Sequence, residues 1–254
     1  MTRFRAPTTF RTDRLRPPTS LAQTTLQFQD LLLFVPVLLF SVIAHEYAHG
    51  YAALKQGDTT ALMLGRLTWN PVKHIDPFMT IILPALLFYA SGGRIMLGGA
   101  KPVPVNPSNY RNYRRGDIIV SLAGVFVNLL IAAASIILFI GVGLLGRSID
   151  AAEPALGIMQ GMFFKALYLN LILVAFNLIP IPPLDGSHVV KHLMPASWAQ
   201  KYEQFGRYGI IVLILLLYVG GGVLSAWMRP LLELGFVLFR WAEPFALPSF
   251  AQWR

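Results

Sequence analysis

The residues best suited to chemistry in this chain form the pentad His45-Glu46-Tyr47-Ala48-His49. In a helix, residues four apart lie only about 40° apart around the axis, so both imidazoles point out from one face. This spacing lets two ring nitrogens bind one zinc ion at about 2.0–2.1 Å. Glu46 stands beside such a metal, where its carboxylate can remove a proton from a water molecule. The pattern predicts a hydrolytic zinc centre, and a buried His/Glu hydrogen-bond cluster between helices is the alternative.

The third ligand of such a centre must come from elsewhere in the chain. A catalytic zinc ion usually has three protein ligands and one open position. The chain has no cysteine, so the third ligand is a His, Asp or Glu. Asp185 is the best candidate, because it follows a proline-rich break at residues 180–183, and non-helical backbone at membrane depth needs protein or a watery cavity around it. The alternative is that Asp185 only caps the next helix through Gly186.

Four further polar residues need a role. His188 and His192 are also four apart, but no Glu accompanies them, and we expect them on a solvated helix surface. His74 lies in a loop bounded by prolines and is expected to be a turn or cap residue. Asn170 lies in an apolar run and is expected to bond a neighbouring helix.

The composition indicates that lipid covers much of the surface. The chain has 254 residues, of which 55% are hydrophobic and 13% charged, whereas about a quarter are charged in an ordinary soluble domain. The net charge of +9 is typical of cytoplasmic loops that face anionic membrane lipid. No basic patch with interleaved aromatic residues indicates a nucleic-acid partner. The absence of cysteine excludes disulfides, thiolate zinc sites, iron–sulfur clusters and cysteine nucleophiles.

The hydropathy pattern predicts an all-α polytopic membrane protein. Four apolar runs are long enough to cross the bilayer: residues 26–54, 117–145, 161–179 and 210–227. Residues 78–90, interrupted by Pro84, are expected to form a re-entrant or short segment, and residues 231–239 an interfacial C-terminal helix that is too short to cross. The pattern at residues 60–72 is compatible with a small β-hairpin.

Three regions follow from this pattern. Residues 1–26 form an Arg-rich arm, expected to be disordered and to touch lipid headgroups. Residues 27–207 are expected to form the intramembrane core that carries the predicted hydrolytic zinc centre, and residues 208–254 add the C-terminal span and the interfacial helix.

Together the motifs resemble those of the site-2 protease family of intramembrane zinc metalloproteases, in its compact bacterial and archaeal form without a PDZ domain. The matching stretches appear in the family's order: residues 45–50 (HEYAHG), 65–77 (GRLTWNPVKHIDP), 100–107 (AKPVPVNP) and 177–186 (NLIPIPPLDG). The resemblance implies that His45, His49 and Asp185 bind one Zn²⁺ per chain and that Glu46 is the general base.

One family motif is only partly matched. The family's Gly-Pro-x-x-Asn pattern reads Gly124-Val125-x-x-Asn128 here, so the Gly and Asn match but Val replaces Pro. Asn128 is a candidate donor to the substrate backbone or to an oxyanion. An interhelical hydrogen bond is the alternative role.

The resemblance also implies the reaction and the place where it occurs. The substrates would be transmembrane segments of other membrane proteins, cut within or near the bilayer by a multi-pass protein of the prokaryotic cell membrane. A hairpin edge at residues 60–72 would receive the unwound substrate by strand addition. Two alternatives stay open: a membrane metal-ion transporter, which would spread its ligands along a path, and a non-cleaving binder of membrane segments, which would lack Glu46 or a ligand.

Topology is where two rules disagree. Five arginines before the first span favour a cytoplasmic N-terminus. For His49 and Asp185 to reach one metal near the same membrane depth, however, the spans that carry or precede them should run parallel. We prefer the second argument, which places the arm outside, makes residues 78–90 re-entrant and opens the site to the cytoplasm.

Overall fold

The computed structural model describes residues 20–82, 86, 89 and 99–253 of the chain. Within these residues all regular structure is helical, and five stretches are long and apolar enough to cross a membrane: Leu31–Gln56, Tyr113–Gly146, Asp150–Asn177, Ala196–Val219 and Gly221–Phe245. The prediction of an all-α polytopic membrane protein is confirmed. The α-helices are α1 (Ser20–Gln56), α2 (Thr60–Met63), α4 (Tyr113–Gly146), α5 (Glu153–Asn177), α6 (Asp185–Leu193), α7 (Ala196–Phe205), α8 (Gly209–Val219) and α9 (Gly221–Ala242).

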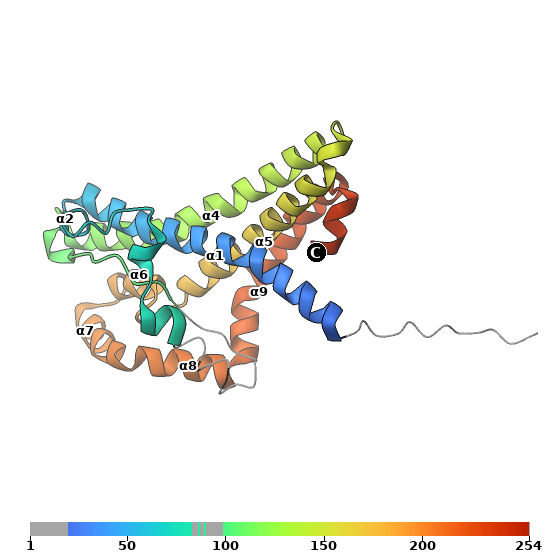
Figure 1. The fold of residues 1–254 in the computed structure, drawn as a ribbon. Coiled ribbons are helices and arrows are strands. Elements are labelled where there is room, and N and C mark those ends of the chain that lie inside the picture. The colour runs from blue at the N-terminus through green and yellow to red at the C-terminus, as the bar shows by residue number, and fades with distance from the viewer. Residues whose placement is uncertain (1–19, 83–85, 87–88, 90–98, 254) are drawn as a thin grey trace, which may run out of the picture.

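The centre of the molecule is formed by α1, α4 and α5, each of which contacts the other two. In Figure 1, α1 and α5 run in the same direction, and α4 runs in the opposite direction. The expected parallel arrangement of the two spans that lead to the ligands is therefore present. The side of the membrane on which the N-terminus lies stays a prediction.

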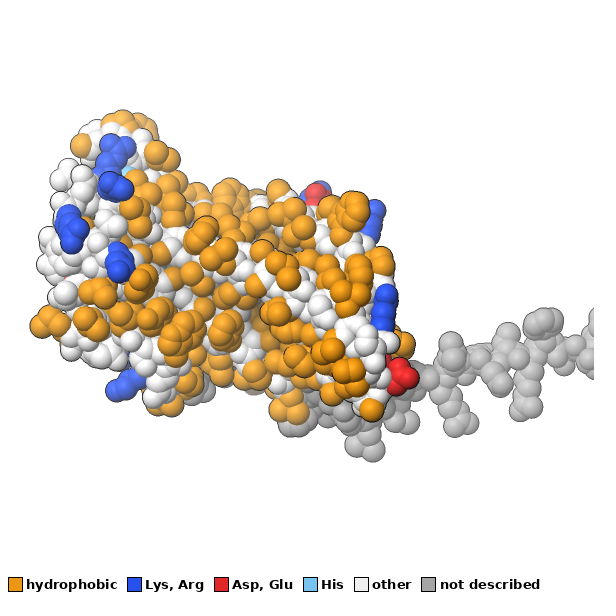
Figure 2. Space-filling model, turned by 90° about the horizontal axis from the view of Figure 1, so that it is seen from above, with side chains coloured by type: hydrophobic (Ala, Val, Ile, Leu, Met, Phe, Trp, Pro, Cys, Tyr) orange, Lys and Arg blue, Asp and Glu red, His pale blue; other side chains and the backbone are white. Residues whose placement is uncertain are grey.

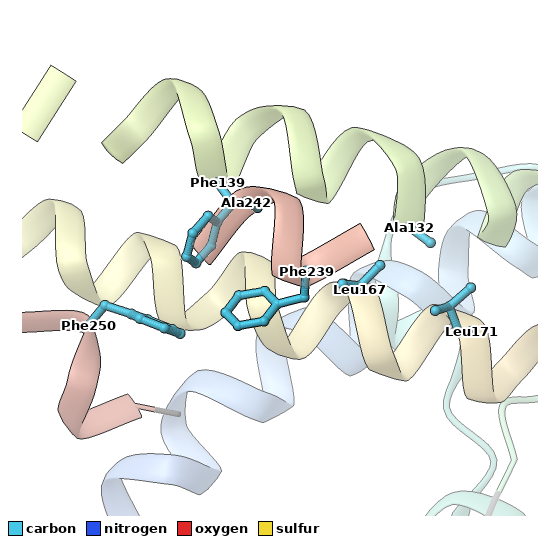
Figure 3. Close-up of a cluster of buried hydrophobic side chains, with 7 residues drawn as sticks. All are labelled: Ala132, Phe139, Leu167, Leu171, Phe239, Ala242 and Phe250. Carbon is cyan, nitrogen blue, oxygen red and sulfur yellow. The ribbon is translucent and has the colours of Figure 1, made fainter. Parts of the chain in front are cut away.

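A cluster of aromatic and aliphatic side chains joins α4, α5, α9 and the C-terminal turn Pro248–Trp253 (Figure 3). The ring of Phe139 packs edge-to-face against Phe239 and Phe250, with centroid separations of 5.4 and 5.1 Å. Such pairs add about 0.5–1.5 kcal/mol beyond the apolar area that they bury. The cluster therefore holds the C-terminal segment against the α4–α5 hairpin.

The outer surface suits a bilayer. Figure 2 shows hydrophobic side chains over the middle of the face in view, with Lys and Arg toward the two ends. Large apolar side chains point outward from the long helices, among them Ile137 on α4 and Ile211 on α8, which are 70% and 65% exposed. In water this surface would be an aggregation hazard, whereas in lipid it is the expected covering. The chain is a multi-pass integral membrane protein.

The hairpin prediction for residues 60–72 is wrong. The chain there forms the short helix α2, a turn at Gly65 with φ of +61°, and a helical turn at Pro71–His74. Local polar bonds explain the difference: Asp58 accepts from the amide of Thr60, and Asn70 accepts from the amide of Val72. Such side chain–backbone bonds compete with strand pairing. The described part of this segment therefore has no strand edge to offer a substrate.

The expectation that residues 231–239 form a separate helix too short to cross is also wrong. They belong to α9, a helix of 22 residues that contains Pro230 and is long and apolar enough to cross, and whether it lies at the interface stays a prediction. A proline inside a membrane helix is tolerated where neighbouring helices stabilise it, and α9 packs against α5 through Gly235, next to Leu171 and Tyr168. The apolar run at 210–227 is divided instead at Gly220, where α8 ends.

Two expectations fall wholly or partly outside the described residues. Of the Arg-rich arm at 1–26, residues 1–19 lie outside them, and α1 begins at Ser20. Of the segment 78–90, residues 83–85, 87, 88 and 90 lie outside, and the helical turn Pro77–Ile82 begins it. Whether this segment crosses stays a prediction.

Candidate active site

Three side chains from two distant parts of the chain meet at one point. The Nε2 atoms of His45 and His49, one turn apart on α1, are 3.0 Å from each other. Asp185, the first residue of α6, places Oδ2 3.3 Å from Nε2 of His45 and Oδ1 3.5 Å from Nε2 of His49. One potential ligand atom from each residue lies within 4.8 Å of the others. The three ligands predicted from the sequence are thus brought together.

Helix α4 holds the opposite nitrogen of each imidazole. Nδ1 of His49 donates to the backbone carbonyl of Val120 at 2.7 Å, and Nδ1 of His45 donates to Oδ1 of Asn128 at 3.3 Å. A proton on Nδ1 leaves Nε2 as the free lone pair, which is the tautomer that binds a metal. Asn128 therefore makes the interhelical hydrogen bond that was its alternative role, and its role as a donor to the substrate stays a prediction.

The arrangement fits a cation and is poorly explained without one. The two Nε2 atoms lie 3.0 Å apart beside a carboxylate, and Oδ2 of Asp185 is buried without a hydrogen-bond partner. Nδ2 of Asn128 is also buried and unpartnered. Unpaired buried polar atoms are costly, and a metal ion removes that cost for the ligand atoms. Two imidazoles and one carboxylate form a donor set that suits zinc with an open position.

Gly124 explains how α4 approaches so closely. A Cβ atom at this position would lie 2.5 Å from Cε1 of His45 and 2.6 Å from Nε2 of His49. No side chain fits there without displacing the ligands. The glycine of the Gly124-Val125-x-x-Asn128 pattern is thus required for packing against both imidazoles.

Glu46 does not join the three ligands. Its Oε2 accepts a hydrogen bond from the backbone amide of Val103 at 2.8 Å. Val103 is buried, and a Cβ on Gly50, one turn beyond Glu46, would lie 2.8 Å from its Cγ1. The guanidinium of Arg66 donates to the carbonyls of Lys101 and Pro102, which fixes the loop that carries Val103. The loop therefore fixes the carboxylate of the residue that directly follows His45.

His188 and His192 do not reach the three ligands. Nε2 of His192 lies 2.7 Å from Oδ2 of Asp117 on α4, and Nδ1 of His188 lies 3.2 Å from Oδ1. The prediction of a solvated surface is wrong for His192, whose side chain is 9% exposed, whereas His188 is 41% exposed. The cause is the buried carboxylate of Asp117, which draws this face of α6 onto α4.

The other two polar residues have structural roles. His74 ends the turn Pro71–His74, is buried, and donates from Nε2 to the carbonyl of Thr68 at 2.9 Å. Asn170 donates from Nδ2 to Oγ of Ser41 at 2.9 Å and so links α5 to α1. Both expectations, a turn residue and an interhelical bond, are confirmed.

Sequence reasoning missed three residues of the site. Val120 and Val103 act through backbone atoms, for which their side chains carry no signal. Asp117 had a signal, since it is a carboxylate at the start of a long apolar run, and a buried ionisable residue in such a run needs a partner.

Comparison with known proteins agrees with these motifs. The family described as peptidase family M50 matches residues 33–152 and 142–219. The Bacillus subtilis protein named "Putative zinc metalloprotease YwhC" is 38% identical over 202 residues, 79% of this chain and 86% of its own length. "Putative zinc metalloprotease Rip2" of Mycobacterium tuberculosis is 34% identical over 189 residues, 72% of this chain and 68% of its own. No solved structure matches. The chain belongs to peptidase family M50, the site-2 protease family that its motifs resemble.

Proposed function

We propose that this M50 peptidase is an intramembrane zinc metalloprotease. It hydrolyses peptide bonds within or near transmembrane segments of other membrane proteins, with one Zn²⁺ bound by His45, His49 and Asp185 and with Glu46 as the general base. It works as a multi-pass protein of a prokaryotic cell membrane, in keeping with the bacterial sources of its relatives.

The observation that carries the proposal is the convergence of three potential ligand atoms, two of them on the α1 turn that also carries Glu46. The ligands come from α1 and from α6, about 140 residues later in the chain, and α4 orients both imidazoles from behind. Such an arrangement forms only if α1, α4 and α6 are all correctly positioned relative to one another. A buried His/Glu hydrogen-bond cluster would not leave Oδ2 of Asp185 unpartnered.

The chain's own residues supply the proton transfers. When bound, zinc polarises a peptide carbonyl and lowers the pKa of a water molecule. Val103 holds Oε2 of Glu46, so we assign proton transfer to Oε1. This oxygen takes a proton from the attacking water as the new C–O bond forms. It then returns the proton to the amide nitrogen as the C–N bond breaks.

The depth of the site supports a substrate inside the membrane. His49 and His45 are seven and eleven residues from the end of α1 at Gln56, which corresponds to about 10 and 16 Å along the helix. The hydrocarbon core of a bilayer is about 30 Å thick. A peptide must therefore enter the span of the protein to reach the ligands, and an unwound transmembrane segment meets this requirement.

The two alternative functions have less support. A transporter would distribute potential ligands along a path, but among the described residues only His45, His49 and Asp185 each place a potential ligand atom within 4.8 Å of the other two. A non-cleaving binder would lack the base or a ligand, whereas Glu46 and all three ligands are present.

A comparison of wild type with Glu46→Gln tests the proposal. Membrane proteomes of cells expressing each form identify proteins that accumulate uncut in the variant, and these are then reconstituted with the purified enzyme. We expect zinc-dependent cleavage by wild type and a loss of about 10²–10⁴-fold in Glu46→Gln, with zinc retained. Glu233→Gln, an exposed carboxylate on α9, is the matched control and should cleave normally. Cleavage by purified Glu46→Gln at the wild-type rate would refute the assigned mechanism.

A further inference from the structure

The third candidate ligand lies on a short helix that the preceding chain holds only at its first turn. Helix α6 has only nine residues, and the segment between α5 and α6 contains three prolines, at positions 180, 182 and 183. Gly186 fixes its start, because a Cβ there would lie 2.3 Å from the carbonyl oxygen of Leu178 at the end of α5. The buried Leu184, packed with Ile179 and Leu213, also holds this first turn. These contacts leave the rest of α6 free to tilt, so a second attachment farther along the helix would fix its direction and that of the Asp185 carboxylate.

Asp117 supplies the second attachment. Its carboxylate, 4% exposed, contacts three side chains of α6: Nδ1 of His188 at 3.2 Å, Nζ of Lys191 at 3.2 Å and Nε2 of His192 at 2.7 Å. The guanidinium of Arg114 also donates to the backbone carbonyl of His192 at 2.7 Å. One turn of α4 thus binds α6 through His188, Lys191 and His192.

On both α4 and α6, the contacts of Asp117 lie on the same helix face as the candidate metal centre. On α6, Asp185, His188 and His192 are spaced i, i+3 and i+7, so they lie along one face. On α4, Asp117, Val120 and Gly124 have the same spacing. Asp117 holds α6, Val120 holds His49, and Gly124 lies against both imidazoles. One face of α4 therefore contacts both α6 and the two histidines of α1, and so sets the position of Asp185 relative to His45 and His49.

A contribution to the stability of the fold does not by itself explain the buried carboxylate of Asp117. A buried ion pair often contributes less than well-packed apolar residues of the same volume, because both charges must leave water. A fixed geometry is the better-supported use of such a group. The ammonium of Lys191, 3.2 Å from Oδ2, balances the charge of this carboxylate.

We propose that Asp117 is a positioning residue for the metal centre: it fixes α6 on α4 and so holds Asp185 opposite His45 and His49. The proposal rests on the proposed function, because it takes Asp185 as the third metal ligand. Asp117 acts through Asp185 and does not touch the ligand atoms itself.

A double-mutant cycle on the full-length protein in detergent tests the proposal. The Kd for Zn²⁺ is measured by competition with a chelator in wild type, Asp117→Asn, Asp185→Ala and the double variant. We expect Asp117→Asn to weaken zinc binding about 10-fold, the low end of the effect of losing a group bonded directly to a metal ligand, because Asp117 acts on Asp185 only through α6. In the Asp185→Ala background the same change should alter the residual Kd less than about twofold, because the residue through which it acts is gone.

Two matched comparisons separate positioning from general stability. His192→Gln keeps a side-chain N–H donor and should bind zinc more tightly than His192→Leu, which keeps none. Gln160→Leu removes a buried polar link elsewhere on α5 and should lower the melting temperature of the metal-free protein without changing the Kd for zinc. The Co²⁺-substituted Asp117→Asn protein should show an altered d–d absorption spectrum.

The outcomes are distinguishable. Wild-type zinc affinity in Asp117→Asn, or an equal loss in both backgrounds, would overturn the positioning role while leaving the proposed protease intact. If wild type itself binds no zinc and cuts no membrane protein, the proposed function and this inference both fail.

Discussion

Gln160 lies in the first third of α5 and Asp185 lies beyond its C-terminal end, and both side chains are polar groups placed among apolar helices. All of Gln160's polar atoms are used: Nε2 donates to the carbonyls of Phe139 and Phe245, each at 3.0 Å, and Oε1 accepts from the amide of Leu247 at 2.9 Å. Near the C-terminal end of α5, by contrast, Oδ2 of Asp185 and Nδ2 of Asn128 are buried without hydrogen-bond partners.

This difference separates a structural polar group from a functional one. A buried polar atom without a partner costs about 1–3 kcal/mol. Gln160 avoids that cost because the C-terminal segment, packed beside the aromatic cluster of Figure 3, supplies its partners. Asp185 can avoid it through a ligand. Other buried atoms, among them Nε1 of Trp253 and Oδ1 of Asn170, also lack partners, so the candidate site is distinguished by three potential metal ligands that converge and not by an unpaired atom alone.

Two glycines on α4 show the same difference between the two ends of this helix. A Cβ at Gly143 would lie 2.0 Å from the backbone oxygen of Phe245, and one at Gly124 would lie 2.5 Å from the ring of His45. Both positions need glycine because another group lies against the helix backbone. At Gly143 that group is the C-terminal chain, and at Gly124 it is the pair of metal ligands.

The largest expected effect concerns the third ligand. Asp185→Ala should weaken zinc binding by more than about 100-fold, because losing a direct ligand exceeds the usual loss from an outer partner. His188→Ala, on the same face of α6, should still bind one zinc ion per chain at saturation. Metal analysis after dialysis against a chelator measures both. The reverse pattern would move the site onto the second half of α6 and undo the assignment.

Gly124→Ala should have the next largest effect. Its methyl group would push α4 away from both imidazoles and spoil the hydrogen bonds to Val120 and Asn128. We expect zinc affinity to fall about 10–100-fold, as for other losses of outer-shell support. Gly141→Ala on the same helix is the control, because a Cβ there meets nothing within 4 Å. Equal zinc affinity in the two variants would mean that Gly124 does not shape the site.

Gln160→Leu tests the opposite end of the comparison. It leaves the amide of Leu247 and the carbonyl of Phe245 without their side-chain partner, so we expect a stability loss of about 2–3 kcal/mol. Zinc affinity should be unchanged. Unfolding in detergent, with the exposed Gln204→Leu as control, measures the loss. A drop in zinc affinity as large as that of Gly124→Ala would show that the two ends are coupled, and the comparison would fail.

The chemistry of the site was largely predictable from the sequence. The spacing of His45 and His49 follows from helix geometry, and the proline break before Asp185 predicted a carboxylate facing protein instead of lipid. The parallel direction of α1 and α5 followed from the need to bring both ligands to one depth.

The partners that orient these ligands were less predictable. A carbonyl such as that of Val120 belongs to every residue type, so no sequence pattern marks the one that holds His49. Asp117 contacts residues about 70 positions away, a separation that periodicity within one helix does not reveal. The errors at residues 60–72 and at Pro230 have local causes: turn-forming side-chain bonds outweighed apolar alternation, and tertiary packing carried α9 through its proline.

Asp58 offers a carboxylate to contrast with Asp185, because its partners all belong to the protein. It is fully buried just beyond the end of α1, and its oxygens accept from the amide of Asn106 at 2.7 Å, from Nδ2 of Asn109 at 2.8 Å, and from the amide and hydroxyl of Thr60. Burial alone would raise the pKa of Asp58, but these hydrogen bonds favour the ionised form and bring the pKa below its ordinary value. A paired carboxylate of this kind stabilises the fold and needs no metal.

The smallest expected effect is therefore a pH dependence at Asp58. Its pKa is lower in the folded than in the unfolded chain, so its contribution to stability is present above the unfolded value of about 3.9 and is lost as the pH falls through the folded value. Asp58→Asn lacks this titration, so its melting temperature should lie below that of wild type at pH 7, and the gap should narrow as the pH falls below about 4. Thermal unfolding of the two metal-free proteins across this range measures the gap. A gap that stays constant down to the lowest pH at which both remain folded would show that the hydrogen bonds to Asp58 do not depend on its charge.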